Sequence, residues 1–328
     1  MNTLPVEAGQ LYQPSGIAVG SGHILVVDSG NHRVVAFDDS GKATAFYGAG
    51  GRDLGEFTTP KSICLTDDKT AFIADVGNKR LCRLDLNSRV VTEVESGFYI
   101  FDVAASPGYI AYTGKRSLAD SLVIISDDSG SIRGIGTPLG IVHEFESVFK
   151  TVNAVKIACN DKYMAVAFPA LALVRVYSFS GDLVAEYFID SSSVYDIRTQ
   201  AWESMLNVPD PVLRDMRLAI DPITRQTILD DLVSLARPDR FGVPIYIADI
   251  GLIDNHVFVL VGDTLHEFDL GGTEVGSYGF VNEAGEKIYV FSFTVDDHGR
   301  IWAADSVHTH NIYYSDSAGW RQNMEDAK

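Results

Sequence analysis

The chain has 328 residues and a formal net charge of −18, because 44 aspartates and glutamates outnumber 26 lysines and arginines. Hydrophobic residues make up 46% of the sequence, which supplies a large core and excludes a disordered acidic chain. The charge also disfavours nucleic acid as a partner, because affinity for phosphate backbones depends on lysine and arginine.

The first 13 residues hold no basic segment followed by an apolar run, so they do not resemble a secretory signal. No stretch reaches the ~20 apolar residues of a membrane span, so we expect no membrane partner. These features predict a cytoplasmic protein, or an exported one if a signal peptide has been removed.

A repeat begins at Pro14. Residues 14–41 read PSGIAVGSGHILVVDSGNHRVVAFDDSG, and residues 60–88 read PKSICLTDDKTAFIADVGNKRLCRLDLNS. Each unit alternates apolar and polar residues between glycine, aspartate and asparagine turns, which is typical of short β-strands. Units of ~40–50 residues with four such strands indicate the blades of a β-propeller.

The same alternation continues through residues 101–130, 154–190 and 245–280, and the repeat returns at residues 294–319. Residues 191–242 interrupt it with a pattern typical of helices. The sequence therefore predicts an all-β, six-bladed propeller over residues 1–328, a single domain with a helical insertion between blades 4 and 5. We expect residues 3–8 to supply the outer strand of blade 6 and so close the ring.

The runs VVDSGNHRVVAFDDSG and FIADVGNKRLCRLD resemble NHL repeats. The resemblance is specific in blades 1 and 2 and recognisable in blade 6. It implies a six-bladed propeller, and it fixes no single activity, because such propellers serve as protein or RNA platforms, as lyases, and as lactone or ester hydrolases. Ser15 and Lys61 stand where the amidating lyases of this family would be expected to place metal-binding histidines.

In an up-and-down blade, the loop between the second and third strands shares a face with the connection to the next blade. The insertion at residues 191–242 belongs to that face. Its apolar stripes and its Asp-Pro helix starts favour ordered helices, which we interpret as a cap over the channel mouth. Packing on the outer rim is the alternative.

Polar residues gather at one position of the inner strands. The aligned residues are Gly16, Ser62, Asp102, Lys156, Asp249 and Phe293. Two carboxylates and a lysine there predict a polar cluster near the channel mouth. A solvated channel lining without a ligand is the alternative, and a register shift of one residue would place the side chains between blades instead.

Loop residues on the same face complete the candidate set. We predict ligand-binding residues at Asp102, Lys156, Asp249, His32, Arg116, His308 and His310. The His308 and His310 pair has the spacing of a metal clamp on a strand, but His310 replaces the repeat arginine, so we assign no metal ligands. We interpret the repeat aspartates Asp28, Asp75 and Asp305 as structural acceptors of backbone N–H groups.

Three functional hypotheses follow. The first is a binding propeller that holds a protein, a peptide or a small molecule on the capped face. The second is a hydrolase or lyase for a small polar substrate, with Asp102 or Asp249 as the base, Lys156 as a stabilising charge, and a divalent ion as an optional partner. The third is RNA binding by loop cations such as Arg33, Lys79 and Arg80, which the net charge opposes. The sequence leaves any cofactor open.

Three cysteines, Cys64, Cys82 and Cys159, lie in apolar strand-like runs without metal-ligand spacing. We expect them to be buried free thiols, because a free cysteine packs as a small hydrophobic residue.

Overall fold

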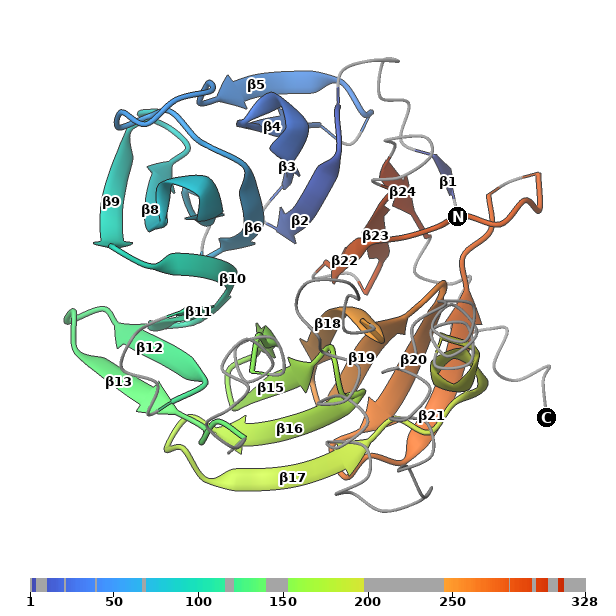
Figure 1. Cartoon of the computed structure of the whole chain (residues 1–328). Helices are drawn as coiled ribbons and strands as arrows, with labels where there is room; N and C mark the ends of the chain where they lie inside the picture. Colours follow the sequence, from blue (N-terminus) through green and yellow to red (C-terminus); the bar gives the residue numbers. More distant parts are fainter. Residues whose placement is uncertain are drawn as a thin grey trace, which may run out of the picture.

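The computed structural model describes residues 2–3, 11–20, 22–38, 40–66, 69–115, 121–139, 153–197, 245–282, 284–296, 299–305 and 312–315. These residues form six antiparallel sheets of four strands, arranged as a ring around a central channel (Figure 1). The all-β, six-bladed architecture predicted from the repeat is confirmed. No helix in the described ranges is long and apolar enough to cross a membrane.

Each of the first five blades runs from its inner to its outer strand in chain order. Blade 1 comprises β2 (Pro14–Gly20), β3 (His23–Asp28), β4 (Arg33–Phe37) and β5 (Ala43–Tyr47). Blade 2 comprises β6 (Pro60–Leu65), β7 (Thr70–Asp75), β8 (Arg80–Asp85) and β9 (Val91–Ser96). Blade 3 comprises β10 (Tyr99–Ser106), β11 (Tyr109–Lys115), β12 (Val123–Asp127) and β13 (Ile132–Ile135).

Blade 4 comprises β14 (Lys156–Cys159), β15 (Tyr163–Phe168), β16 (Leu173–Ser178) and β17 (Leu183–Phe188). Blade 5 comprises β18 (Ile247–Ile253), β19 (His256–Val261), β20 (Thr264–Asp269) and β21 (Glu274–Gly279). Blade 6 has three late strands, β22 (Ser292–Val295), β23 (Ile301–Ala304) and β24 (Ile312–Tyr314).

The outer strand of blade 6 comes from the start of the chain. Strand β1 (Asn2–Thr3) pairs with β24, with Asn2 opposite Tyr314 and Thr3 opposite Tyr313. Closure by the N-terminal segment is confirmed, at residues 2–3, while residues 4–8 lie outside the described part. The join leaves blade 6 with four strands like the others.

The core is divided among the boundaries between blades. Six clusters of buried apolar side chains fill these boundaries in the described part of the chain, each drawn mainly from two neighbouring blades. The boundary between blades 6 and 1, for example, packs Trp302 and Ile312 against Ile17 and Val26. A blade is apolar on both faces, so each blade depends on its neighbours for burial.

The repeat aspartates hold the loops together. Asp28 accepts hydrogen bonds from the backbone N–H of Tyr12 at 2.6 Å, from Asn31 at 2.9 Å and from Arg33 at 2.7 Å. Asp75 makes the equivalent bonds in blade 2. Its partners are the N–H of Thr58 at 2.8 Å, Asn78 at 2.8 Å and Arg80 at 2.9 Å. The structural role predicted for these two aspartates is confirmed.

Of the predicted insertion, the structure describes residues 191–197, with a helix over residues 192–197. Val194 and Ile197 pack against the apolar cluster between blades 4 and 5. Ile197 lies near Gly262, in the turn between β19 and β20. The insertion thus leaves blade 4 on the predicted face, while residues 198–242, and with them the rest of the predicted cap, lie outside the described part.

Candidate ligand-binding site at the channel mouth

A recurring backbone irregularity sets the positions of the polar residues. In β2, β6, β10 and β18 the pairing register shifts across one extra residue near the start of the strand. Such β-bulges turn the following side chains to new directions. The residue after the bulge is Gly16, Ser62, Asp102 or Asp249, each at the end of the channel where the connections between blades lie.

Pairing identifies the equivalent residues in the other two blades. Lys156 begins β14 opposite Ala167, and Ser292 begins β22 opposite Ala304, the residue before the repeat Asp305. Ser62 likewise lies opposite Ala74, just before Asp75. The prediction of Phe293 for blade 6 is therefore wrong by one residue, because Ser292, and not Phe293, pairs with the residue before the repeat aspartate. We call the resulting set, Gly16, Ser62, Asp102, Lys156, Asp249 and Ser292, the polar ring.

Members of the polar ring join neighbouring inner strands. Asp102 accepts a hydrogen bond from the backbone N–H of Ile157 at 2.8 Å, and Asp249 accepts one from that of Phe293 at 3.0 Å. The hydroxyl of Ser62 accepts from the N–H of Val103 at 3.3 Å. In each case the donor is the residue after the polar-ring position of the next blade. These side chains thus accept hydrogen bonds from backbone N–H groups on the inner edge of the next sheet, which have no partner within that sheet.

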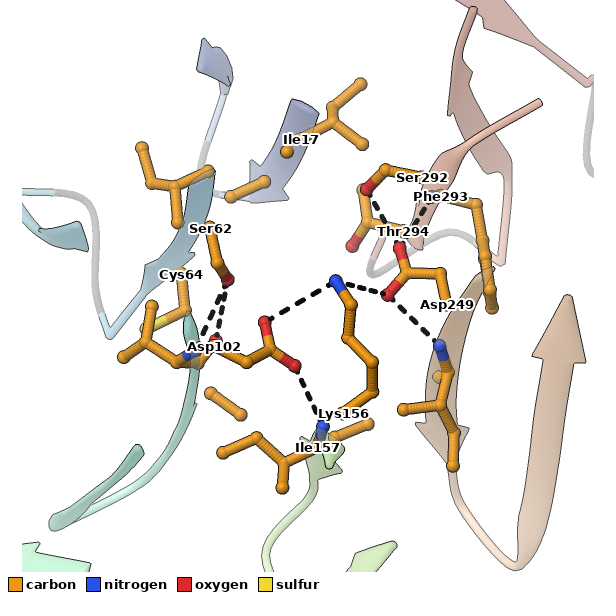
Figure 2. Close-up of a pocket in the computed structure, with 18 of the residues that line it drawn as sticks. Ile17, Ser62, Cys64, Asp102, Lys156, Ile157, Asp249, Ser292, Phe293 and Thr294 are labelled. Atoms are coloured by element: carbon orange, nitrogen blue, oxygen red, sulfur yellow. Dashed lines mark hydrogen bonds and ion pairs between the residues drawn. The ribbon is translucent and has the colours of Figure 1, made fainter. Parts of the chain in front are cut away.

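Lys156 lies between the two carboxylates. Its ammonium nitrogen is 3.9 Å from Oδ1 of Asp102 and 3.7 Å from Oδ1 of Asp249 (Figure 2). Asp249 also accepts hydrogen bonds from the hydroxyl of Ser292 at 2.8 Å and from the N–H of Ile250 at 3.1 Å. The structure therefore brings together the three charged residues that the sequence singled out on the inner strands.

These groups line a cavity of ≈ 350 Å³ formed by the six inner strands. The side chain of Lys156 is 24% exposed, against 7% for Asp102 and 12% for Asp249. The ammonium is thus the most accessible of the three charges. A volume of this size is at the lower end of the range of small-molecule sites, ~300–1,000 Å³.

Burial and the neighbouring carboxylates act in opposite directions on the pKa of Lys156. Burial disfavours the ammonium, but Asp102 and Asp249 outweigh it and raise the pKa of Lys156 above its ordinary value. Burial raises the pKa of Asp249, with Asp102 adding to the rise and Lys156 opposing it. Lys156 is therefore a cation at neutral pH, with three N–H donors directed among acceptors.

The cluster does not fit a divalent metal ion. Within the described residues, no three histidine, cysteine, aspartate or glutamate side chains come together as ligands. The ammonium of Lys156 lies between the two carboxylates that would have to supply the ligands, and it would repel a second cation.

The predicted loop residues do not join this cluster where they can be placed. His32 has a left-handed backbone with φ of 56°, and its Nδ1 accepts a hydrogen bond from the N–H of Thr59 at 3.0 Å. It is not among the residues that line the cavity. Arg116, His308 and His310 lie outside the described residues.

Two of the three loop cations proposed for RNA, Arg80 and Arg33, are paired with the repeat aspartates. Arg80 is 5% exposed, pairs with Asp75, and donates to the carbonyl oxygens of Asp53 at 3.0 Å and Glu56 at 2.6 Å. Arg33 pairs with Asp28. Neither guanidinium is left free to neutralise phosphates.

The sequence did not predict that Ser292 belongs to the polar ring, or that two of the three thiols are partly exposed. All three cysteines are free, as predicted, and Cys82 is buried. Cys64 and Cys159 are instead partly exposed, because they line the cavity two and three residues beyond the polar ring on β6 and β14. Both also pack against apolar clusters between blades, so their apolar sequence context gave no sign of this exposure.

Comparisons with known proteins agree with the fold. The NHL repeat family matches residues 11–37. No curated protein sequence matches the chain. A gluconolactonase from Xanthomonas campestris has 12% sequence identity and a TM-score of 0.59, with 95% of this chain and 87% of that chain covered. A virginiamycin B lyase from Staphylococcus aureus has 12% identity and a TM-score of 0.52, with 96% and 86% covered. At these identities the likeness shows a shared fold.

Proposed function

We propose that this chain, an NHL-repeat β-propeller of six blades, binds a small polar ligand at the mouth of its central channel. The site is the cavity that contains Lys156, Asp102 and Asp249, on the face from which the insertion at residues 191–242 departs.

The observation that carries the proposal is that the charges are not needed to join the blades. Ser62 makes the same bond to the next inner strand as Asp102 does, with an uncharged hydroxyl. Blade 1 has no side chain at all at this position, because the residue is Gly16, where a Cβ would lie only 3.0 Å from the carbonyl oxygen of Lys61. Placing three charged groups in a largely buried position costs free energy, so a structural role alone does not account for them.

The geometry favours a small ligand over a protein surface. Asp102 and Asp249 are 7% and 12% exposed, too deep for a flat surface to contact. A small molecule, or the terminus or side chain of a peptide, can enter the cavity and contact both the ammonium and the carboxylates. The ammonium donates to ligand oxygens, and the carboxylates accept from ligand hydroxyl or amino groups.

A ligand screen on the whole chain tests the proposal. Sugars, sugar acids, sugar phosphates and amino acids are added singly, and binding is followed by saturation-transfer NMR and by the rise in Tm. We expect at least one compound to bind to the wild type and to Asp161→Asn, a control in the turn between β14 and β15 at the opposite end of the channel. Binding should fall at least tenfold in Lys156→Gln and in Asp102→Asn. Hits that survive both substitutions, or a screen without hits, would overturn it.

A hydrolase or lyase at the same site is the second candidate. The observation that favours it is a buried carboxyl with a raised pKa beside a lysine ammonium in a cavity, since perturbed groups gather at catalytic sites. The fold is shared with a gluconolactonase and with a lyase. This reading predicts turnover of a small lactone or ester that Asp249→Asn abolishes, whereas a binding protein shows none.

A further inference from the structure

The bulged residues form a second set at the starts of the inner strands, and of these only Ser15 lines the cavity itself. The residue that the pairing skips is Ser15 in β2, Lys61 in β6, Phe101 in β10 and Ala248 in β18. Each comes one position before the polar ring and so lies nearer the start of its strand. Ser15 links this set to the next blade, because its hydroxyl donates to the carbonyl oxygens of Pro60 at 3.3 Å and Lys61 at 3.0 Å.

Lys61 is the cation of this set, and nothing in the described part of the chain neutralises it. Its residue is exposed, between the buried Pro60 and Ser62. No ion pair of its ammonium is found among the described residues, whereas Lys156 has two carboxylates and Lys287 has Asp263. An unpaired lysine at the mouth is notable in a chain that carries 44 acidic residues.

Lys61 is also coupled to the polar ring. Partial burial lowers the pKa of Lys61, and the nearby charge of Lys156 lowers it further. The two ammonium groups therefore repel each other, and the carboxylates of Asp102 and Asp249 pair with Lys156 and not with Lys61. An anion beside Lys61 would relieve this repulsion.

We propose that Lys61 binds the anionic group, a carboxylate or a phosphate, of the ligand that enters the channel. This inference rests on the proposed function and names its ligand class. The anionic group stays at the mouth, because the carboxylates of Asp102 and Asp249 repel it farther in. The opposite end of the ligand carries hydroxyl or amino groups that donate to those carboxylates. The ligand is thus a small hydroxylated or aminated molecule with one acidic group.

The test compares ligands that differ in charge alone. Glucuronate and glucose 6-phosphate are measured against glucose by NMR titration, on wild type, Lys61→Gln and Lys61→Arg. We expect the wild type to bind one of the acidic sugars at least tenfold more tightly than glucose, and the stronger of the two identifies the anion as carboxylate or phosphate. Lys61→Gln should lose that preference and Lys61→Arg should keep most of it. Lys162→Gln, at the opposite end of the channel, should match the wild type.

A second measurement works without any sugar bound. Acetylation by an amine-selective reagent is followed at each lysine by mass spectrometry, with inorganic phosphate or acetate added at constant ionic strength. We expect either anion to slow the modification of Lys61 several-fold and to leave Lys162 unchanged. Equal effects at both lysines, together with an acidic-sugar preference that survives Lys61→Gln, would overturn the inference. If Lys156→Gln still abolished binding in that case, the proposed function would stand without it.

Discussion

The carboxylate of Asp102 accepts a hydrogen bond from the backbone N–H of Ile157, across the boundary between blades 3 and 4, at 2.8 Å. The same carboxylate faces the ammonium of Lys156. One side chain therefore joins two blades and also shapes the cavity. Substitutions in the polar ring will affect stability as well as binding, and the two effects can be measured separately.

We predict that Asp102→Ala destabilises the fold more than Ser62→Ala does. Removing Asp102 leaves the N–H of Ile157 without its acceptor and takes one counter-charge from Lys156, at a cost of about 2–4 kcal/mol. Removing the hydroxyl of Ser62 loses two longer, uncharged bonds to the backbone of Val103 and should cost about 1 kcal/mol. Urea denaturation of both variants gives the comparison, and equal losses would contradict the distinction.

We predict a pH dependence that Asp249→Asn removes. The folded state raises the pKa of Asp249, chiefly through burial, above the ordinary value of 3.8. The folded state therefore holds this proton more tightly than the unfolded chain does. The resulting stabilisation is complete below the unfolded pKa and is lost as the pH rises through the folded pKa.

The difference in unfolding free energy between wild type and Asp249→Asn should accordingly shift against the wild type as the pH rises from about 4 toward neutrality. Urea denaturation of both proteins at intervals of half a pH unit measures this. A difference that shifts in favour of the wild type would show that the charge of Lys156 lowers the pKa of Asp249 by more than burial raises it.

The repeat ion pairs should differ in strength. Arg80 is 5% exposed and Arg33 is 27% exposed, although their aspartate partners are equally buried. Asp75→Ala leaves a buried guanidinium unpaired and should cost about 3–5 kcal/mol. Asp28→Ala should cost less, because water can reach Arg33. Chemical denaturation of the two variants decides the order, and Lys162→Ala in the turn between β14 and β15 serves as a control for general effects of substitution.

The thiols should be unreactive in the folded protein. Burial raises the pKa of Cys82 and of Cys159 to about 12, and it raises the pKa of Cys64 as well. Because the thiolate is the reactive form, a disulfide reagent at about pH 8 should modify the native protein slowly despite the partial exposure of Cys64 and Cys159. All three should react at once in denaturant. Rapid labelling of the folded state would contradict these environments.

The blades could be predicted because strand alternation and turn residues recur with one period, and each unit needs the next for burial. The three charged residues of the polar ring followed from the same alignment. Ser292 did not, because the alignment on the apolar residues of the inner strands matched Phe293 to this position, and only the backbone pairing of Ser292 with Ala304 reveals the difference of one residue.

Lys61 shows a second limit of sequence reasoning. In the sequence it stands where the amidating lyases would be expected to place a histidine, and this indicates nothing about a role for the lysine itself. Its significance depends on having no partner and on its proximity to Lys156, which lies in another blade. Relationships of this kind arise from the closure of the ring and have no signature in the local sequence.

The pairing of Thr3 with Tyr313 makes the two ends of the chain parts of one sheet. During synthesis on a ribosome, the first strand must wait for the last blade to emerge before it gains a partner. Five blades can assemble in sequence, but the circle forms in a single late event. A nascent chain therefore exposes the unpaired faces of blade 1 and of the newest blade until blade 6 has been made, and that interval is when a chaperone would have the most to protect.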